Sequence, residues 1–222
     1  MLNSRRMWVT GSLLVALVAL PGAAFAFSSA SPADSNGSTG SIATGFPTNC
    51  SSCHSGGAGV GSVAITGVPS SYDPSTTYSL VVTVTDSNAV FAGFQLSVED
   101  ASGAPAGSLV ITDATNTQLT GSMVGHTTSG FLSSGSLATG TSFTADWTSP
   151  ASDAGPVTFW AAGNAVNGDF SIAGDTVHNT SATATITTIV TPVPMISSWG
   201  LGALVSLMLV GGTVLRVRRS QA

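Results

Sequence analysis

The sequence predicts an all-β protein that folds as an immunoglobulin-like antiparallel β-sandwich. Several short segments alternate apolar and polar residues with a period of two, and Thr and Val are frequent in them. Gly, Pro, Asn and Asp separate these segments, as turn residues separate antiparallel strands. No segment between residues 27 and 190 has apolar residues at helical spacing. Seven or eight strands in roughly 130 residues are typical of a two-sheet sandwich.

Each expected strand follows from its own alternation. In residues 78–84, Tyr, Leu and Val alternate with Ser and Thr, which suits a strand with one buried face. The clearest strands are expected at Tyr78–Val84, Phe94–Glu99, Phe143–Trp147, Val157–Phe159 and Ala182–Thr187, and shorter ones at Val63–Val68, Ser108–Thr112 and Gln118–Val124. The chain has no Cys…Trp…Cys spacing, which excludes an antibody-type domain.

The N-terminal residues have the pattern of an export signal. Arg5 and Arg6 precede an apolar run, and Ala24-Phe25-Ala26 is a small-x-small cleavage site. Residues 1–26 are therefore expected to be a secretory signal peptide.

The C-terminal residues have the pattern of a membrane anchor. Residues 195–215 contain no charge and, at ~1.5 Å per residue, would cross roughly 30 Å of hydrocarbon. Arg216, Arg218 and Arg219 follow at once and mark the cytoplasmic side. Residues 191–222 are therefore expected to form a single-pass transmembrane anchor, with the preceding domain outside the cytoplasm.

The chain between these ends divides into three parts. Residues 27–49 are rich in Ser, Gly, Ala and Pro and predict a flexible leader. Residues 50–61 contain both cysteines of the chain in a Ser/Gly-rich stretch, and residues 62–190 contain the predicted strands.

Charge is distributed unevenly along the chain. The sequence has no lysine, its five arginines all lie at the two ends, and its ten carboxylates all lie between Asp34 and Asp175. A domain without Lys or Arg cannot neutralise phosphates, which excludes nucleic-acid binding, and the lysine of a P-loop is missing. A protein partner that docks electrostatically should be basic.

The segment Cys50-Ser51-Ser52-Cys53-His54 is a C-x-x-C-H motif, the attachment signature of c-type haem. In such a motif both thiols bond to one porphyrin edge and the histidine is the proximal ligand of the iron. We therefore expect one covalent haem c, attached at Cys50 and Cys53 and bound through His54. Three alternatives remain open, namely a Cys50–Cys53 disulfide, a redox-active dithiol and part of a zinc site.

A distal iron ligand would have to come from another histidine or from methionine. His126 is the first candidate because it lies in a polar, loop-like stretch, while Met123 is the second and His178 the weakest. Trp147 is expected in the core, and Asp169 and Asp175 look like turn residues. No catalytic constellation stands out, so an electron carrier is expected rather than an enzyme.

An ordered set of short segments follows the C-x-x-C-H motif: Gly93-Phe94-Gln95-Leu96, Gly103-Ala104-Pro105-Ala106-Gly107, Gly125-His126-Thr127, Asp146-Trp147-Thr148-Ser149-Pro150, Gly155–Ala165, Asn167-Gly168-Asp169 and Gly174-Asp175. Over about residues 46 to 189 this order resembles the Reelin-like domain of bacterial envelope proteins, a group described as having a choice-of-anchor architecture. The resemblance implies a sandwich with haem c, and it matches His126 to a His-Thr segment of the family.

The tail Pro192–Gly200, followed by an apolar run and arginines, is similar to the IPTL-type sorting signals of Gram-negative bacteria, with Met195 where leucine is usual. This resemblance implies a Gram-negative cell envelope and sorting of the domain to the cell surface, with the span either kept or removed.

Three functions compete at this point. The leading hypothesis is an envelope-anchored monohaem c-type cytochrome that passes single electrons to an unknown redox partner protein. The alternative is a surface-displayed adhesion or ligand-binding sandwich, in which the haem or a disulfide is structural. A haem-based gas sensor is the third, and it requires an open position opposite His54.

Overall fold

The computed structural model describes residues 29, 38–41, 50–135 and 137–187. The expected signal peptide, the expected C-terminal anchor and most of the expected leader lie outside these residues. Within the described ranges, no helix is long and apolar enough to cross a membrane.

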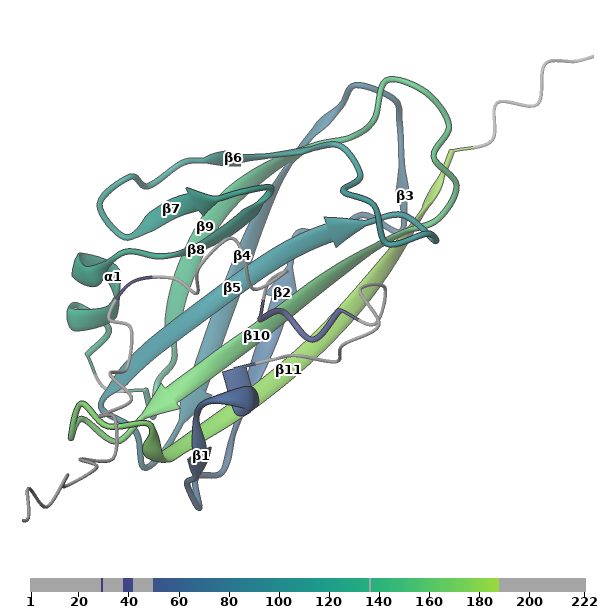
Figure 1. Ribbon diagram of the computed structural model, residues 1–222. Coiled ribbons are helices and arrows are strands. Elements are labelled where there is room, and N and C mark those ends of the chain that lie inside the picture. Colours follow the sequence, from purple (N-terminus) through teal and green to yellow (C-terminus); the bar gives the residue numbers. More distant parts are fainter. Residues whose placement is uncertain (1–28, 30–37, 42–49, 136, 188–222) are drawn as a thin grey trace, which may run out of the picture. The chain divides into compact units, whose positions relative to one another are not determined.

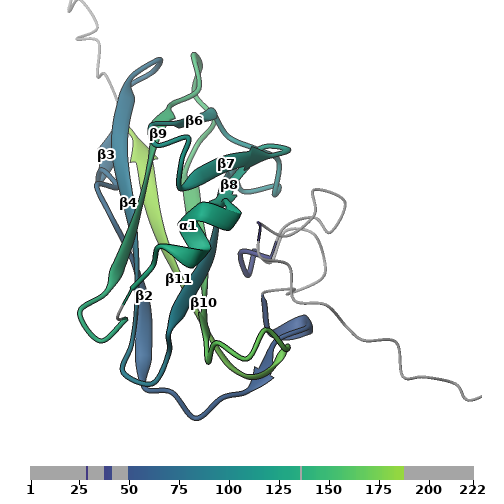
Figure 2. The same ribbon diagram turned by 90° about the vertical axis from the view of Figure 1, so that its left-hand side faces the viewer.

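The described part of the chain forms two β-sheets (Figures 1 and 2). The small sheet has four antiparallel strands in the order β2 (Gly61–Thr66), β4 (Thr77–Asp86), β9 (Thr141–Thr148) and β6 (Ser108–Ile111). The large sheet has the order β1 (Ser55–Gly56), β11 (Ala173–Ile186), β10 (Val157–Val166), β5 (Phe91–Glu99), β8 (Met123–His126) and β7 (Thr117–Thr120), and β3 (Ser71–Tyr72) also pairs with β11. The prediction of an all-β sandwich is confirmed.

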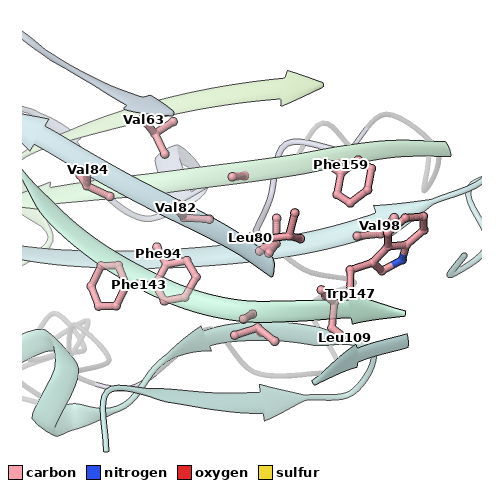
Figure 3. Packing of buried hydrophobic residues seen from close by; sticks show 14 of the residues in the cluster. Val63, Leu80, Val82, Val84, Phe94, Val98, Leu109, Phe143, Trp147 and Phe159 are labelled. Atoms are coloured by element: carbon pink, nitrogen blue, oxygen red, sulfur yellow. The ribbon is translucent and has the colours of Figure 1, made fainter. Parts of the chain in front are cut away.

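The hydrophobic core lies between the two sheets, where alternate residues of each strand meet (Figure 3). Trp147 of β9 is its largest fully buried side chain, and its indole nitrogen donates a hydrogen bond of 2.8 Å to the carbonyl of Ala106. Tyr72 and Phe159 pack edge-on against Trp147. The prediction that Trp147 belongs to the core is confirmed.

Two parts of the strand prediction are wrong. Residues 118–124 were expected to be one strand, but they belong to a hairpin of β7 and β8, because Gly121 adopts a positive φ of 64° between them. The last strand was expected to begin at Ala182, but β11 already begins at Ala173, because pairing with β10 overrides the polar composition of its first half. The short helix α1 (Thr128–Leu132) follows β8 and is capped by Thr127.

Strand β5 is unusual because it is buried on both faces. Its even-numbered residues belong to the core, whereas Gly93, Gln95, Ser97 and Glu99 point to the opposite face, which we call the outer face of the large sheet. Residues 38–41 cover part of the outer face. Within this range the Ser38 amide donates to the Gln95 side chain, the Thr39 and Ser97 hydroxyls lie 3.0 Å apart, and Ser41 donates to Glu99. This part of the expected flexible leader is therefore packed on the sheet.

Candidate functional site

The C-x-x-C-H motif forms a single tight turn. Cys50–Ser52 is a 3₁₀ helix, and the Cys50 carbonyl accepts hydrogen bonds from the amides of Cys53, at 3.2 Å, and His54, at 2.9 Å. Residues three apart in such a helix lie on the same side, so the two cysteine side chains share one face of the turn. Both are free thiols, with Cys53 exposed and Cys50 partly buried.

The Cys50 thiol is poorly suited to thiolate chemistry. Burial raises its pKa to about 12, a backbone hydrogen bond lowers the pKa by less, and the neighbouring Cys53 adds a still smaller increase. A redox-active dithiol needs a nucleophilic cysteine with a lowered pKa. Among the described residues, no group of three or more His, Cys, Asp or Glu side chains is placed to hold a metal ion.

The chain after the motif is tied to the large sheet. Strand β1 pairs in parallel with the start of β11, with hydrogen bonds of 3.0 Å from the Ser55 amide to the Ile172 carbonyl and from the Gly57 amide to the Asp175 carbonyl. This pairing brings His54 against Asp175, whose position is on the outer face of β11. Figure 2 shows the turn and residues 38–41 on the same side of the large sheet.

His54 is held through one ring nitrogen. Its Nδ1 lies 2.6 Å from Oδ2 of Asp175, whose side chain is fully buried, while the His54 side chain keeps 15% of its surface exposed. Because a carboxylate only accepts hydrogen bonds, the proton belongs on Nδ1. When the imidazole is neutral, the other nitrogen, Nε2, keeps its lone pair, which is the arrangement of a metal-ligating histidine.

Asp175 is held on its other side as well. Its Oδ1 accepts a hydrogen bond of 3.1 Å from the amide of Asn167. The prediction that Asp175 is a turn residue is wrong, because the residue lies within β11. Asp169, by contrast, is a turn residue whose Oδ1 accepts from the Ser171 amide.

His126 also lies on the large sheet, at the end of β8. The ladder between β5 and β8 pairs Gln95 with Gly125 and Leu96 with Val124, so the next pair would be Phe94 with His126. At that position the imidazole takes the place of a backbone partner, with Nδ1 3.1 Å from the Phe94 carbonyl oxygen and 3.0 Å from its amide nitrogen. The prediction of a loop-like environment is wrong, because this residue is 8% exposed.

The second ring nitrogen of His126 is buried and unpaired. Nε2 has no hydrogen-bond partner among the described residues. The Phe94 amide donates a hydrogen bond of 3.0 Å to Nδ1, so the ring is held through this nitrogen by the Phe94 backbone. His126 is thus held through Nδ1, as His54 is, and its Nε2 has no partner among the described residues.

The pKa of His126 is lowered to about 4. Burial is the largest cause, the hydrogen bond to Phe94 opposes it, and the charge of His54 lowers the pKa further. The imidazole is therefore neutral at pH 7.

Strand register relates the strands that hold the two histidines. Gly93 of β5 pairs with Asn164 of β10, which pairs with Val177 of β11, two residues from Asp175. At ~4.8 Å between strands, β5 and β11 are about 10 Å apart, so one imidazole at each strand can face the space between them. A Cβ atom at Gly93 would lie 2.9 Å from Cε1 of His126, so this glycine makes room for the ring.

On this part of the outer face lie three buried polar atoms that have no hydrogen-bond partner among the described residues. They are Nε2 of His126, Nε2 of Gln95 and Oδ1 of Asn164. Each such atom costs about 1–3 kcal/mol when left unsatisfied. Three of them on neighbouring strands mark a place where a bound group would supply partners.

An apolar wall borders the same region. The Phe131 ring of α1 lies 5.9 Å from the His126 ring and 5.1 Å from the Phe91 ring. Phe170 lies 6.1 Å from Phe91, is 63% exposed and adopts a positive φ of 61°, which is rare for a bulky residue. The two imidazoles and the two thiols on one turn are the kinds of ligand that a c-type haem uses. The aromatic side chains provide an apolar surface beside them.

The other predicted ligands lie elsewhere. Met123 is buried at the start of β8, about 10 Å along the strand from His126. His178 is on the opposite face of β11 from Asp175, and its Nε2 lies 3.2 Å from Oδ2 of the buried Asp86 in the small sheet.

The roles of Asp175, Gly93, Gln95 and Asn164 were not predicted from the sequence. The only local signal was a pair of amide side chains, Gln95 and Asn164, inside strands that are otherwise suited to burial. Asp175 gave no signal, because its partner His54 is 121 residues away in the sequence.

Comparisons with known proteins give only distant likenesses. No protein-family model matches the chain, and no curated protein matches it. Among solved structures, the chain is similar to the human F-spondin reeler domain, with 18% identity, 60% of this chain and 94% of that chain covered, and a TM-score of 0.42. A structure of the Reelin-N domain of F-spondin gives 17% identity, 63% and 96% coverage, and a TM-score of 0.44.

Proposed function

We propose that this chain is a monohaem c-type cytochrome module that carries single electrons outside the cytoplasm. The observation that supports this most strongly is the pair of imidazoles on the outer face of the large sheet. Both rings are held through Nδ1, His54 by Asp175 and His126 by the Phe94 backbone, and Nε2 of His126 has no partner among the described residues. His54 also adjoins the only two cysteines of the chain.

Each residue of the site would have a separate task. Cys50 and Cys53 would form the two thioether bonds, His54 would be the proximal ligand and His126 the distal ligand. When bound, haem supplies a one-electron iron couple. The chain holds the two imidazoles in fixed orientations through Asp175 and Phe94, so little in the ligand set has to move when an electron arrives or leaves.

Ligation by both His54 and His126 would favour electron transfer over gas sensing, because a sensor needs an open position on the iron. The neutral state of His126 at pH 7 supports its role, since only an unprotonated imidazole binds a metal. The absence of Lys and Arg from residues 7–215 makes a basic redox partner protein the best fit electrostatically.

We also propose an envelope location for the module. Export is supported by the signal-peptide pattern of residues 1–26 and by the sequence resemblance to Reelin-like envelope domains. Membrane anchoring is supported by the apolar span and the arginines that follow it in residues 191–222. C-type haem is attached outside the cytoplasm, which agrees with that location.

The test is to export residues 27–190 in a host with haem c maturation machinery and to record the intact mass and the reduced absorption spectrum. We expect the mass of one added haem and a sharp reduced α-band, and neither in a variant that carries Cys50→Ser and Cys53→Ser. A product without haem that is two protons lighter than the dithiol would refute the proposal. It would favour an adhesion or ligand-binding sandwich with a Cys50–Cys53 disulfide.

A further inference from the structure

We propose that Asp175 is a positioning residue that acts through His54 to lower the reduction potential of this module. The inference rests on the proposed function, because it assigns a role to a residue behind the proximal ligand. It predicts that the reduction potential of the module is lowered and that Asp175 is the side chain that lowers it.

The contact between His54 and Asp175 is short, and its carboxylate is buried. The Nδ1···Oδ2 distance of 2.6 Å is at the short end for a hydrogen bond between a nitrogen and a carboxylate, where such bonds are strongest. The Asp175 side chain has no exposed surface, so water weakens the interaction less than it would between two exposed groups. The Asn167 amide holds the second carboxylate oxygen, which prevents the group from turning away.

A carboxylate behind a ligating imidazole makes the ligand more basic. Asp175 withdraws the Nδ1 proton partly from the ring, and the ring becomes a better electron donor at Nε2. A more basic ligand and a nearby fixed negative charge both favour the more positive oxidation state of a metal. The electron comes from a redox partner protein, no covalent bond changes, and the proton stays between Nδ1 and Oδ2.

The two histidines differ in this respect. Nδ1 of His126 faces the neutral backbone of Phe94, whose amide donates to it at 3.0 Å and whose carbonyl oxygen lies 3.1 Å away. Only His54 has an anionic acceptor, so the effect is assigned to one side of the site. The sequence places no Lys or Arg in residues 7–215, so no such side chain from this range offsets the charge of Asp175.

The first experiment compares midpoint potentials of the exported, haem-loaded chain with those of its Asp175→Asn variant. Asparagine keeps the size and an acceptor oxygen but removes the charge. We expect the variant to favour the reduced state at least tenfold more, which corresponds to a rise of 59 mV for a one-electron couple. The low-spin spectrum should remain, because both imidazoles are still present.

The matched control is Asp169→Asn, which removes one charge from the connection between β10 and β11, six residues before Asp175, without touching His54. A small rise for this variant and a large one for Asp175→Asn would support the proposal. Equal rises would refute it, because they would show a general charge effect. An unchanged potential in haem-loaded Asp175→Asn would refute it as well.

A second measurement does not depend on the folding of that variant. His126→Ala should leave the ferrous iron bound to His54 alone, so that resonance Raman spectroscopy can detect the iron–histidine stretch. A frequency raised above that of an imidazole bonded to a neutral acceptor supports the role of Asp175, and an ordinary frequency refutes it. Loss of haem from the wild-type chain would instead refute the proposed function, so the two failures can be told apart.

Discussion

The unusual state of His126 predicts an acid-sensitive step in the stability of the haem-free domain. The ordinary pKa of histidine is 6.5, and burial lowers that of His126 to about 4 in the folded protein. Between these two values the unfolded chain binds a proton that the folded chain does not bind. The free energy of unfolding must therefore fall as the pH is lowered through this range.

The size of this effect follows from the two pKa values. Each pKa unit corresponds to 1.36 kcal/mol, so the neutral imidazole accounts for a loss of about 3 kcal/mol between pH 7 and pH 4. For a domain with a typical stability of roughly 5–15 kcal/mol, such a loss is easily measured.

The assay is urea denaturation of residues 27–190 carrying Cys50→Ser and Cys53→Ser, at several pH values from 7 to 4. The comparison variant adds His126→Asn, which can still bond to the Phe94 backbone but does not titrate. We expect the difference in unfolding free energy between the two proteins to change by about 3 kcal/mol across the range. Parallel curves for the two proteins would refute the assignment of a buried, neutral His126.

Two further substitutions test the site and the core separately. Gly93→Ala places a Cβ atom 2.9 Å from Cε1 of His126, so it should displace the ring and convert part of the haem-loaded protein to high spin. An unchanged absorption spectrum would contradict the proposed distal ligand. Trp147→Ala should lower the unfolding free energy of the haem-free domain by about 4 kcal/mol, because its side chain is fully buried. The partly buried Trp160 is the control, and an equal loss in Trp160→Ala would contradict the described core.

The fold class could be predicted because a half-buried strand imposes a period of two on its sequence. Residues 77–86 illustrate this, since buried and partly buried positions alternate along most of β4. The hairpin at Gly121 was missed because residues on both sides of it continue an apolar pattern. The first half of β11 was missed because its strand character comes from pairing with β10, which the local sequence does not display.

The candidate site was predictable only where its signal is local. The spacing of Cys50, Cys53 and His54 identifies a haem motif within five residues. His126 could be named as a candidate but not placed, because its burial depends on the gap it fills beside Phe94. Asp175 could not be found, because its role arises from the parallel pairing of β1 with β11, far away in the sequence.

The most direct test of the account is the ferric electron paramagnetic resonance spectrum of the exported, haem-loaded protein at neutral pH, recorded beside that of His126→Ala. Ligation by both His54 and His126 predicts a low-spin signal in the wild-type protein and a high-spin signal in the variant. A wild-type protein that is already high-spin, or a variant whose low-spin signal is unchanged, would contradict the central claim that these two histidines bind one iron.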